Sequence, residues 1–202
     1  MREISKGILE WSWFSQEKAI DFNGHLLMEN GEGCLIDPPS FSLQEQEILQ
    51  KKKFHAILIT NRDHVREAEL SRTLFKAPVM GPEADAPFVD IKVDQTFRDG
   101  DRLPGGIEVI SIHHGKSPGE SALWFPGSGG VLVLGDALIG KPKGELNLLP
   151  AEKFSDRKRA IDGLRVFLRF DFEMVLVGDG ESVLRNGKKA VENFFAREGF
   201  DV

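Results

Sequence analysis

The chain has 202 residues and carries 26 basic against 32 acidic side chains, which gives a net charge of −6. This acidic balance disfavours a general nucleic-acid binder, because contact with a phosphate backbone needs a basic face. Hydrophobic residues make up 41% and charged residues 29% of the sequence, which is typical of a globular protein. The length predicts a single domain over residues 1–202 with a full hydrophobic core.

Cysteine content and hydropathy indicate the cellular compartment in which the protein is expected. The only cysteine, Cys34, excludes an intramolecular disulfide and a cysteine-rich zinc site. No stretch approaches the ~18 apolar residues of a membrane span, and the first residues lack the apolar region of a signal peptide. We therefore expect a cytoplasmic protein without a membrane partner, and the sequence does not indicate its oligomeric state.

Short apolar runs alternate with turn signals in the first half of the chain. The runs typical of strands are 8–14, 23–28, 33–37 and 54–60. The Asn-Gly pair at 30–31 predicts a hairpin turn between the second and third of these runs. Ser42, followed three residues later by Glu45, forms a capping-box pattern and predicts the start of a helix. Helical spacing predicts another helix over 65–75.

The second half of the chain repeats this mixture of strands and helices. The predicted strands are 107–113, 121–125, 130–134 and 174–177. The predicted helices are 154–170 and 182–197. The predicted order along the chain is a group of strands, a helix, further strands and then helices. This order indicates an α/β sandwich with mixed sheets.

Polar side chains cluster directly after four of the predicted strands. The four stretches are 60–64 (TNRDH), 113–120 (HHGKSPGE), 135–136 (GD) and 178–180 (GDG). The carboxyl ends of strands form the ligand crevice of open α/β sheets, so these stretches can converge on one site. An aspartate after a strand is also a common cap, and Asp63 has that alternative as the N-cap of the following helix.

The order of these four stretches resembles the metallo-β-lactamase-fold hydrolases. In that family successive strands end in H-x-H-x-D-H, in G-H-T-P-G-S, in G-D and in G-H-G. The corresponding stretches here are ILITNRDHVREA, HHGKSPGES, VLGDAL and VLVGDGES, and GHLLMENGEGCLIDPP resembles the opening hairpin of the family. The resemblance covers most of the chain. It implies the α/β (α+β) class and a four-layer αββα, metallo-β-lactamase-like sandwich.

Most metal-binding positions of the family are replaced. When Asp63 and His64 are matched to the final D-H of the first motif, Ile59 and Asn61 stand where its first two histidines are. Lys116 stands at the histidine of the second motif. Isoleucine cannot ligate a metal, and lysine must lose a proton to do so. The resemblance therefore implies that one metal's ligand set is lost and that no dinuclear zinc centre of the usual kind forms.

The resemblance leaves a second ligand set in place. Its members would be Asp63, His64, Asp136 and Asp179. A set rich in oxygen favours Mn²⁺, Mg²⁺ or Fe²⁺ over a softer histidine-rich zinc site, and the cofactor would be one divalent ion, Mn, Fe, Mg or Zn. Such an ion could activate a water, with Asp63 and Lys116 as the catalytic candidates. The residues are equally compatible with a site that holds no ion, in which Lys116 would supply the missing positive charge.

Two hypotheses about function follow from these residues. The first is a metal-dependent hydrolase with a reduced one-metal site, acting on a small ester, thioester or lactone. The second is a non-catalytic member that binds a small molecule or a partner protein through a cluster of Lys116 and the aspartates. In that case the Lys116 ammonium should lie within salt-bridge reach of at least one of Asp63, Asp136 and Asp179. A generic α/β binding domain with capping aspartates is disfavoured, because four segments in the right order rarely arise by chance.

Three further polar residues near the predicted strand ends have no assigned role. His113 and His114 lie on opposite faces of a strand end, because successive strand residues alternate. Glu120 could point into the site, although it replaces a small residue of the family pattern.

Overall fold

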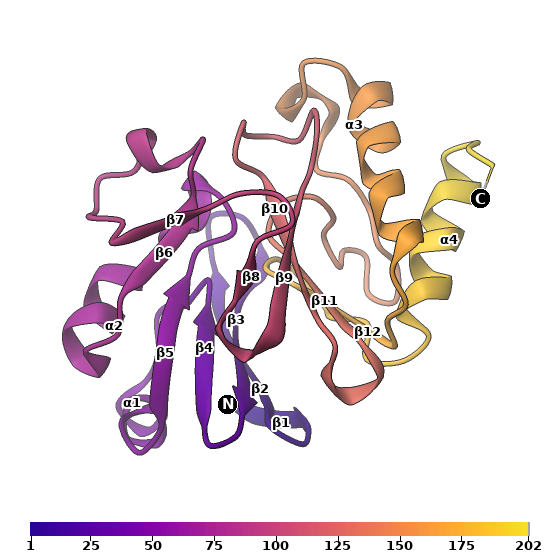
Figure 1. The fold of residues 1–202 in the computed structure, drawn as a ribbon. Coiled ribbons are helices and arrows are strands. Elements are labelled where there is room, and N and C mark those ends of the chain that lie inside the picture. The colour runs from indigo at the N-terminus through magenta and orange to yellow at the C-terminus, as the bar shows by residue number, and fades with distance from the viewer. Residues whose placement is uncertain (202) are drawn as a thin grey trace.

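Two β-sheets pack face to face between two pairs of helices in the computed structural model, which describes residues 1–201 (Figure 1). Helices α1 and α2 cover the outer face of the first sheet, and α3 and α4 cover the outer face of the second (Figure 1). The predicted four-layer αββα sandwich is therefore confirmed. The helices are α1 (Leu43–Gln50), α2 (Ala68–Phe75), α3 (Arg157–Gly163) and α4 (Gly187–Arg197).

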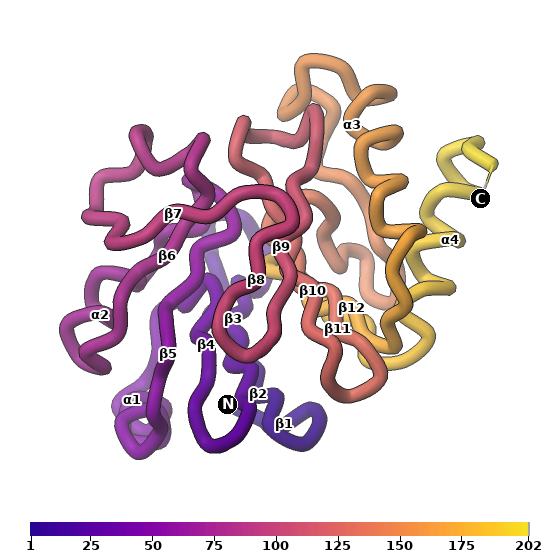
Figure 2. Tube along the Cα trace, viewed as in Figure 1, coloured from indigo at the N-terminus to yellow at the C-terminus, as the bar shows by residue number. Residues whose placement is uncertain are grey.

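The first sheet has seven strands in sequential order, antiparallel from β1 to β4 and parallel from β4 to β7. They are β1 (Arg2–Ser5), β2 (Ile8–Ser15), β3 (Ile20–Glu29), β4 (Glu32–Ile36), β5 (Lys53–Leu58), β6 (Val79–Pro82) and β7 (Gln95–Phe97). The second sheet has the order β12-β11-β10-β9-β8, with β11 and β12 parallel. Its strands are β8 (Arg102–Leu103), β9 (Ile107–Ser111), β10 (Ser121–Phe125), β11 (Val131–Leu134) and β12 (Met174–Val177). The chain passes from the first sheet to the second only once, after β7 (Figure 2).

Each central strand contributes to two cores, because its side chains alternate between the two faces of the sheet. In β3, Leu27 packs between the sheets, and its neighbour Leu26 packs under α1 and α2. In β11, Val133 packs between the sheets, and Leu132 packs under α3 and α4. Three hydrophobic cores thus separate four layers, which explains why these strands read as continuous apolar runs in the sequence.

Two of the predicted local signals have the expected geometry. The hairpin between β3 and β4 turns at Asn30 and Gly31, whose φ angles of 50° and 89° suit an Asn-Gly turn. The capping box is present at α1: the Ser42 hydroxyl accepts from the Glu45 backbone N–H, and the Glu45 carboxylate accepts from that of Ser42. Both signals depend only on neighbouring residues.

Two predicted helices are shorter than expected. The segment 154–170 forms α3 and then a 3₁₀ turn, Leu164–Arg169, rather than one helix. The last helix begins at Gly187 instead of 182, because Asn186 has a left-handed φ of 55° that interrupts a right-handed helix. Strands β1, β6, β7 and β8 were not predicted. They are short, and they form because neighbouring strands of the sheet pair with them, which a local sequence pattern does not show.

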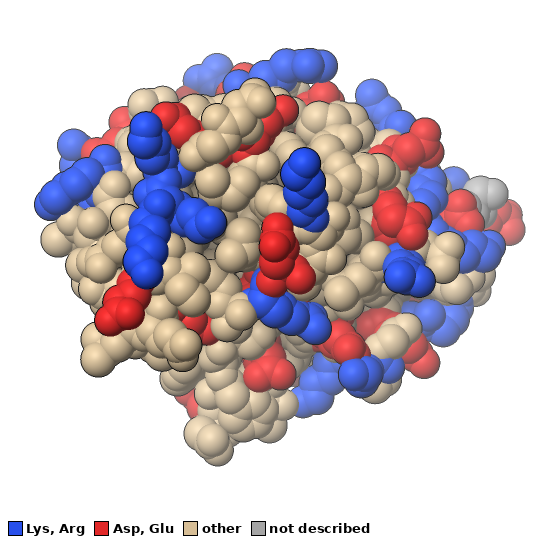
Figure 3. Space-filling model, turned by 90° about the horizontal axis from the view of Figure 1, so that it is seen from below, with Lys and Arg blue, Asp and Glu red and all other residues tan. Residues whose placement is uncertain are grey.

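The longest helix, α4, has 11 residues, and no helix within residues 1–201 combines the length and hydrophobicity needed to cross a membrane. On the face shown in Figure 3, basic and acidic side chains are interspersed rather than gathered into one field.

Phe194 is fully buried in the core under α4, whereas the Phe88 side chain is 62% exposed. We expect Phe194→Ala to lower the free energy of unfolding by about 3–5 kcal/mol through lost burial and the cavity left behind. Phe88→Ala, the matched control, should change it by less than about 1 kcal/mol. Urea denaturation of the two variants measures both values. Equal effects would contradict the packing of α4 on the second sheet.

Candidate functional site

The carboxyl ends of strands from both sheets meet at one cleft. Asp63 and His64 lie in a 3₁₀ turn after β5, Asp136 follows β11 and Asp179 follows β12. Lys116 comes from the loop between β9 and β10. All five side chains line a single cleft of 610 Å³, as the sequence predicts.

Lys116 joins two of the aspartates. Its Nζ lies 2.8 Å from Oδ2 of Asp136 and 2.9 Å from Oδ2 of Asp63. The expected salt bridge of Lys116 is thus confirmed. Burial lowers the pKa of Lys116, but the carboxylates of Asp136 and Asp63 outweigh burial and hold this pKa above its usual value. Lys116 is therefore a cation in the folded protein at neutral pH.

His64 is buried between two carboxylates. Its Nδ1 lies 2.8 Å from Oδ2 of Asp37, and its Nε2 lies 3.6 Å from Oδ1 of Asp136. Burial and the Arg66 guanidinium disfavour the charged ring, yet the carboxylates of Asp37 and Asp136 raise the pKa of His64 to about 10. Thr60 fixes Asp37 in turn, donating its backbone N–H at 2.8 Å and its hydroxyl at 2.6 Å.

Arg66 completes the site, and sequence reasoning missed it. Its Nη2 lies 2.7 Å from Oδ1 of Asp179 and 3.5 Å from Nε2 of His64. The guanidinium also stacks on the Phe22 ring, 4.8 Å from its centroid. Its other hydrogen bonds run to the backbone carbonyls of Asn23, Asp37 and Gly178. No motif signals this residue, because its partners come from three distant segments of the chain.

Asn61 stands where the resemblance places a family histidine, and it organises the floor of the cleft. Its amide donates to Oε1 of Glu120 at 3.1 Å and to Oδ2 of Asp136 at 3.3 Å. Its side-chain oxygen accepts from the Asp63 backbone N–H at 2.8 Å. The N-cap of α2 is Glu67, so the alternative interpretation of Asp63 as that cap is wrong.

Glu120 points into the site, beneath the ion pairs. The side chain is 1% exposed and accepts from the Asp136 backbone N–H at 3.2 Å. Burial and the neighbouring Asp136 carboxylate raise the pKa of Glu120 well above its usual value. His113 and His114, by contrast, are exposed and line a neighbouring surface hollow, which shares only Lys116 with the main cleft.

Three side chains of the cleft could offer donor atoms to one divalent ion. Donor atoms of His64, Asp136 and Asp179 lie within 4.8 Å of one another, which is close enough to share an ion. Asp63 does not belong to this group, and its carboxylate pairs with Lys116 at 2.9 Å. An ion at the group would lie beside the Arg66 guanidinium, which Asp179 and three backbone carbonyls hold in place. The residues therefore do not fit a resident divalent ion while Arg66 keeps this position.

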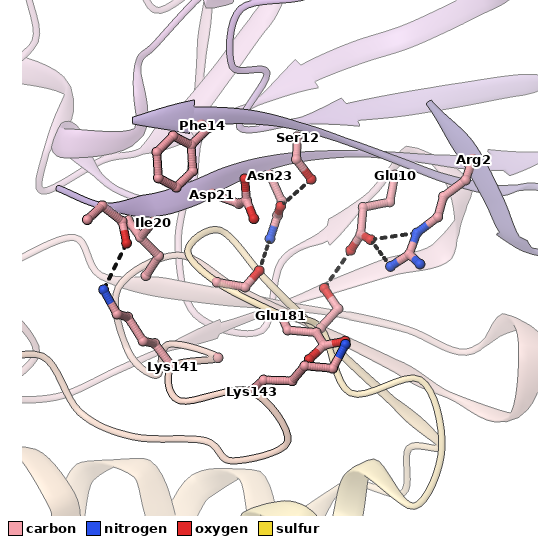
Figure 4. Close-up of a pocket in the computed structure, with 14 residues that line it drawn as sticks. Arg2, Glu10, Ser12, Phe14, Ile20, Asp21, Asn23, Lys141, Lys143 and Glu181 are labelled. Atoms are coloured by element: carbon pink, nitrogen blue, oxygen red, sulfur yellow. Dashed lines mark hydrogen bonds and ion pairs between the residues drawn. The ribbon is translucent and has the colours of Figure 1, made fainter. Parts of the chain in front are cut away.

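A second, smaller hollow of 390 Å³ adjoins the cleft, between β2, β3 and the loop after β12 (Figure 4). Asn23 clamps this loop to β3, donating to the carbonyls of Gly180 at 2.6 Å and Val177 at 2.8 Å. Glu10 lies deeper and accepts from the Ser182 hydroxyl at 2.5 Å and from Arg2 at 2.7 Å. These bonds tie the first sheet to the loop that carries Asp179.

The charge of Glu10 contributes to stability above acidic pH. Burial raises the pKa of Glu10, but His25, Ser182 and Arg2 together lower it to about 2 from its usual 4.5. A depressed folded-state pKa means that the stabilisation is present above pH 4.5 and is lost as the pH falls towards 2.

We expect Glu10→Gln to lose stability at pH 7, on the order of 2–3 kcal/mol, and much less at low pH. The measurement is urea denaturation at a series of pH values. Glu17→Gln is the control and should change the pH dependence far less than Glu10→Gln, because its only ion-pair partner, Lys18, is exposed and solvent screens this pair. A variant Glu10→Gln with the full acid sensitivity of the parent would contradict the assignment.

Comparison with known protein families and solved structures identifies the class of protein to which this four-layer fold and its cleft belong. A sequence model of the metallo-beta-lactamase superfamily matches residues 2–197, and the chain belongs to this superfamily. No curated protein matches the sequence at a significant level.

Solved structures with a similar fold include metallo-β-lactamases. The chain is similar to DIM-1 metallo-β-lactamase, with a TM-score of 0.71 and 16% identity over 95% of each chain. It is similar to the metallo-β-lactamase from Pontibacter korlensis, with a TM-score of 0.72 and 16% identity over 95% of this chain and 94% of that one. It is also similar to TTHA1623 in a di-iron-bound form, with a TM-score of 0.68 and 21% identity over 91% and 96%. Identities this low establish a shared fold alone.

Proposed function

We propose that this protein is a ligand-binding member of the metallo-β-lactamase superfamily in which side chains replace the metal centre. The replacement is an ion-pair cluster of Asp63, His64, Arg66, Lys116, Asp136 and Asp179. The observation that carries the proposal is the position of the Lys116 ammonium, 2.8 Å from Asp136 and 2.9 Å from Asp63.

Charge balance explains why such a cluster is stable without an ion. Three carboxylates at one cleft repel one another unless cations lie close by. Lys116 supplies one positive charge and three donors, and the Arg66 guanidinium supplies another beside Asp179. Together with the His64 ring, which its pKa of about 10 keeps charged, these cations match the three carboxylates in number, but they cannot generate the metal-activated water of a metallohydrolase. We therefore infer binding of a small molecule in the cleft rather than hydrolysis. The cytoplasmic location stays a prediction.

A one-metal hydrolase is the second candidate, and one observation favours it. The Asp37 carboxylate contacts Nδ1 of His64 at 2.8 Å, an arrangement that orients metal-binding histidines in metalloenzymes. The ion would be Mn, Fe, Mg or Zn, the substrate a small ester, thioester or lactone, and the catalytic residues Asp63 and Lys116. This candidate requires Arg66 to leave His64 and Asp179.

Elemental analysis of protein purified without chelator separates the two candidates. We expect no divalent ion near stoichiometric amounts and no saturable binding of Mn²⁺ or Zn²⁺ by calorimetry. Arg66→Met should create measurable affinity for these ions, because it frees Asp179 and removes the positive charge beside Nε2 of His64. Arg62→Met is the control, since Arg62 makes no contact with the aspartates of the cluster. One tightly held ion per parent chain would refute the replacement of the metal centre and favour the hydrolase candidate.

Removal of the Lys116 ammonium should leave Asp63 and Asp136 uncompensated. We expect Lys116→Ala to lower the free energy of unfolding by about 3 kcal/mol, since breaking a buried pair strands its partner charge. Mn²⁺ or Zn²⁺ should recover part of the loss by supplying positive charge. Thermal unfolding with and without each ion is the measurement, and Lys92→Ala, at an exposed ion pair, is the control. If Lys116→Ala matches the parent and neither ion shifts it, the proposed role of the cluster is refuted.

A further inference from the structure

The rim of the main cleft carries positive charge that the ion-pair cluster does not neutralise. Five lysine and arginine side chains line the cleft against three carboxylates, in addition to His64, whose charge faces Asp37 and Asp136. Each carboxylate already has a close cation: Lys116 pairs with Asp63 and Asp136, and Arg66 pairs with Asp179, all at 2.7–2.9 Å. The remaining cations are the rim lysines, Lys18, Lys141 and Lys153. This excess stands out in a chain whose net charge is −6.

The rim lysines have few internal partners. Lys141 donates to the backbone carbonyl of Ala19 at 2.8 Å. Lys18 pairs with Glu17, but the two side chains are 60% and 81% exposed, so solvent screens this pair. Within residues 1–201, Lys153 forms no ion pair. The mouth of the cleft therefore has positive charge available to a ligand.

The same cleft also has an apolar wall. Ile20 and Phe22 contribute from β3, and the loop after β11 adds Ile139, Leu149 and Pro150. The volume of 610 Å³ lies in the range of about 300–1,000 Å³ found for pockets that hold small molecules. Such a wall favours a ligand with an apolar body, because apolar surface is removed from water on binding.

We propose that the cleft binds a small amphipathic anion, with a carboxylate or phosphate head at the rim lysines and an apolar body on the wall formed by Ile20, Phe22 and Leu149. The positive rim attracts the anion from solution, and the apolar wall holds it. This inference rests on the proposed function, because a resident divalent ion would itself take the anionic head.

Calorimetry at low salt with three probes of similar shape tests the proposal. Phenylacetate and phenyl phosphate carry an anionic head, whereas phenylacetamide is the neutral counterpart of phenylacetate. We expect at least one anion to bind about tenfold more tightly than the amide, with an affinity that falls as salt rises. Comparison of the two anions identifies the preferred head group. Equal binding of all three probes, or no binding at millimolar concentration, would overturn the proposal.

Substitution of Lys153 locates the binding. Lys153→Gln should weaken the preferred anion about threefold or more and leave the amide unchanged, while Lys153→Arg should keep the affinity. Lys189→Gln removes the same charge from the exposed face of α4, where the side chain is 68% exposed, and should have no effect. If Lys153→Gln and Lys189→Gln behave alike, the anion does not bind at this rim.

The failure of this inference is distinguishable from the failure of the proposed function. A metal-free parent that shows no preference for the anions retains the ion-pair cluster and refutes only the ligand class. A parent that contains one tightly held ion refutes the cluster, whatever the probes show.

Discussion

Buried negative charge is the constraint on which the site depends. Asp136 is 3% exposed, and a carboxylate at that depth is costly unless a cation lies beside it. The Lys116 ammonium meets this need at 2.8 Å and reaches Asp63 as well. Because one lysine serves two carboxylates, the loop after β9 and the turn after β5 are held together. Burial raises the pKa of Asp136, but His64 and Lys116 outweigh it and keep that pKa below its usual value.

The scaffold brings these groups together through the strand directions. Strands β4 and β5 run parallel in the first sheet, and β11 and β12 run parallel in the second, so their carboxyl ends open on the same side. Asn23 then fastens β3 to the loop after β12, and Arg66 reaches the same loop from the turn before α2. The two sheets are thus joined by polar contacts at the site as well as by the apolar core between them.

In this chain, family membership and the chemistry of the site depend on different residues. The match over residues 2–197 and the fold comparisons place it in the metallo-β-lactamase superfamily. The chemistry depends on single side chains, and two of them, Lys116 and Arg66, bring positive charge to the places where carboxylates need it. A fold can keep its framework while the charges at its site are supplied differently, because packing and site chemistry rest on different residues.

The sequence alone determined the layers and most of the cleft. Periodicity located the buried strands. Neighbouring residues were enough to predict the Asn-Gly turn and the Ser42 capping box. Four polar stretches after strands indicated where Lys116 and the aspartates would meet. Only the tertiary structure showed that Arg66 reaches Asp179 and that Asp37 supports His64. It also showed that β6 and β7 pair as strands. The physical reason is range: local signals act between residues a few positions apart, whereas these contacts join segments separated by as many as 113 positions and exist only once both sheets have formed.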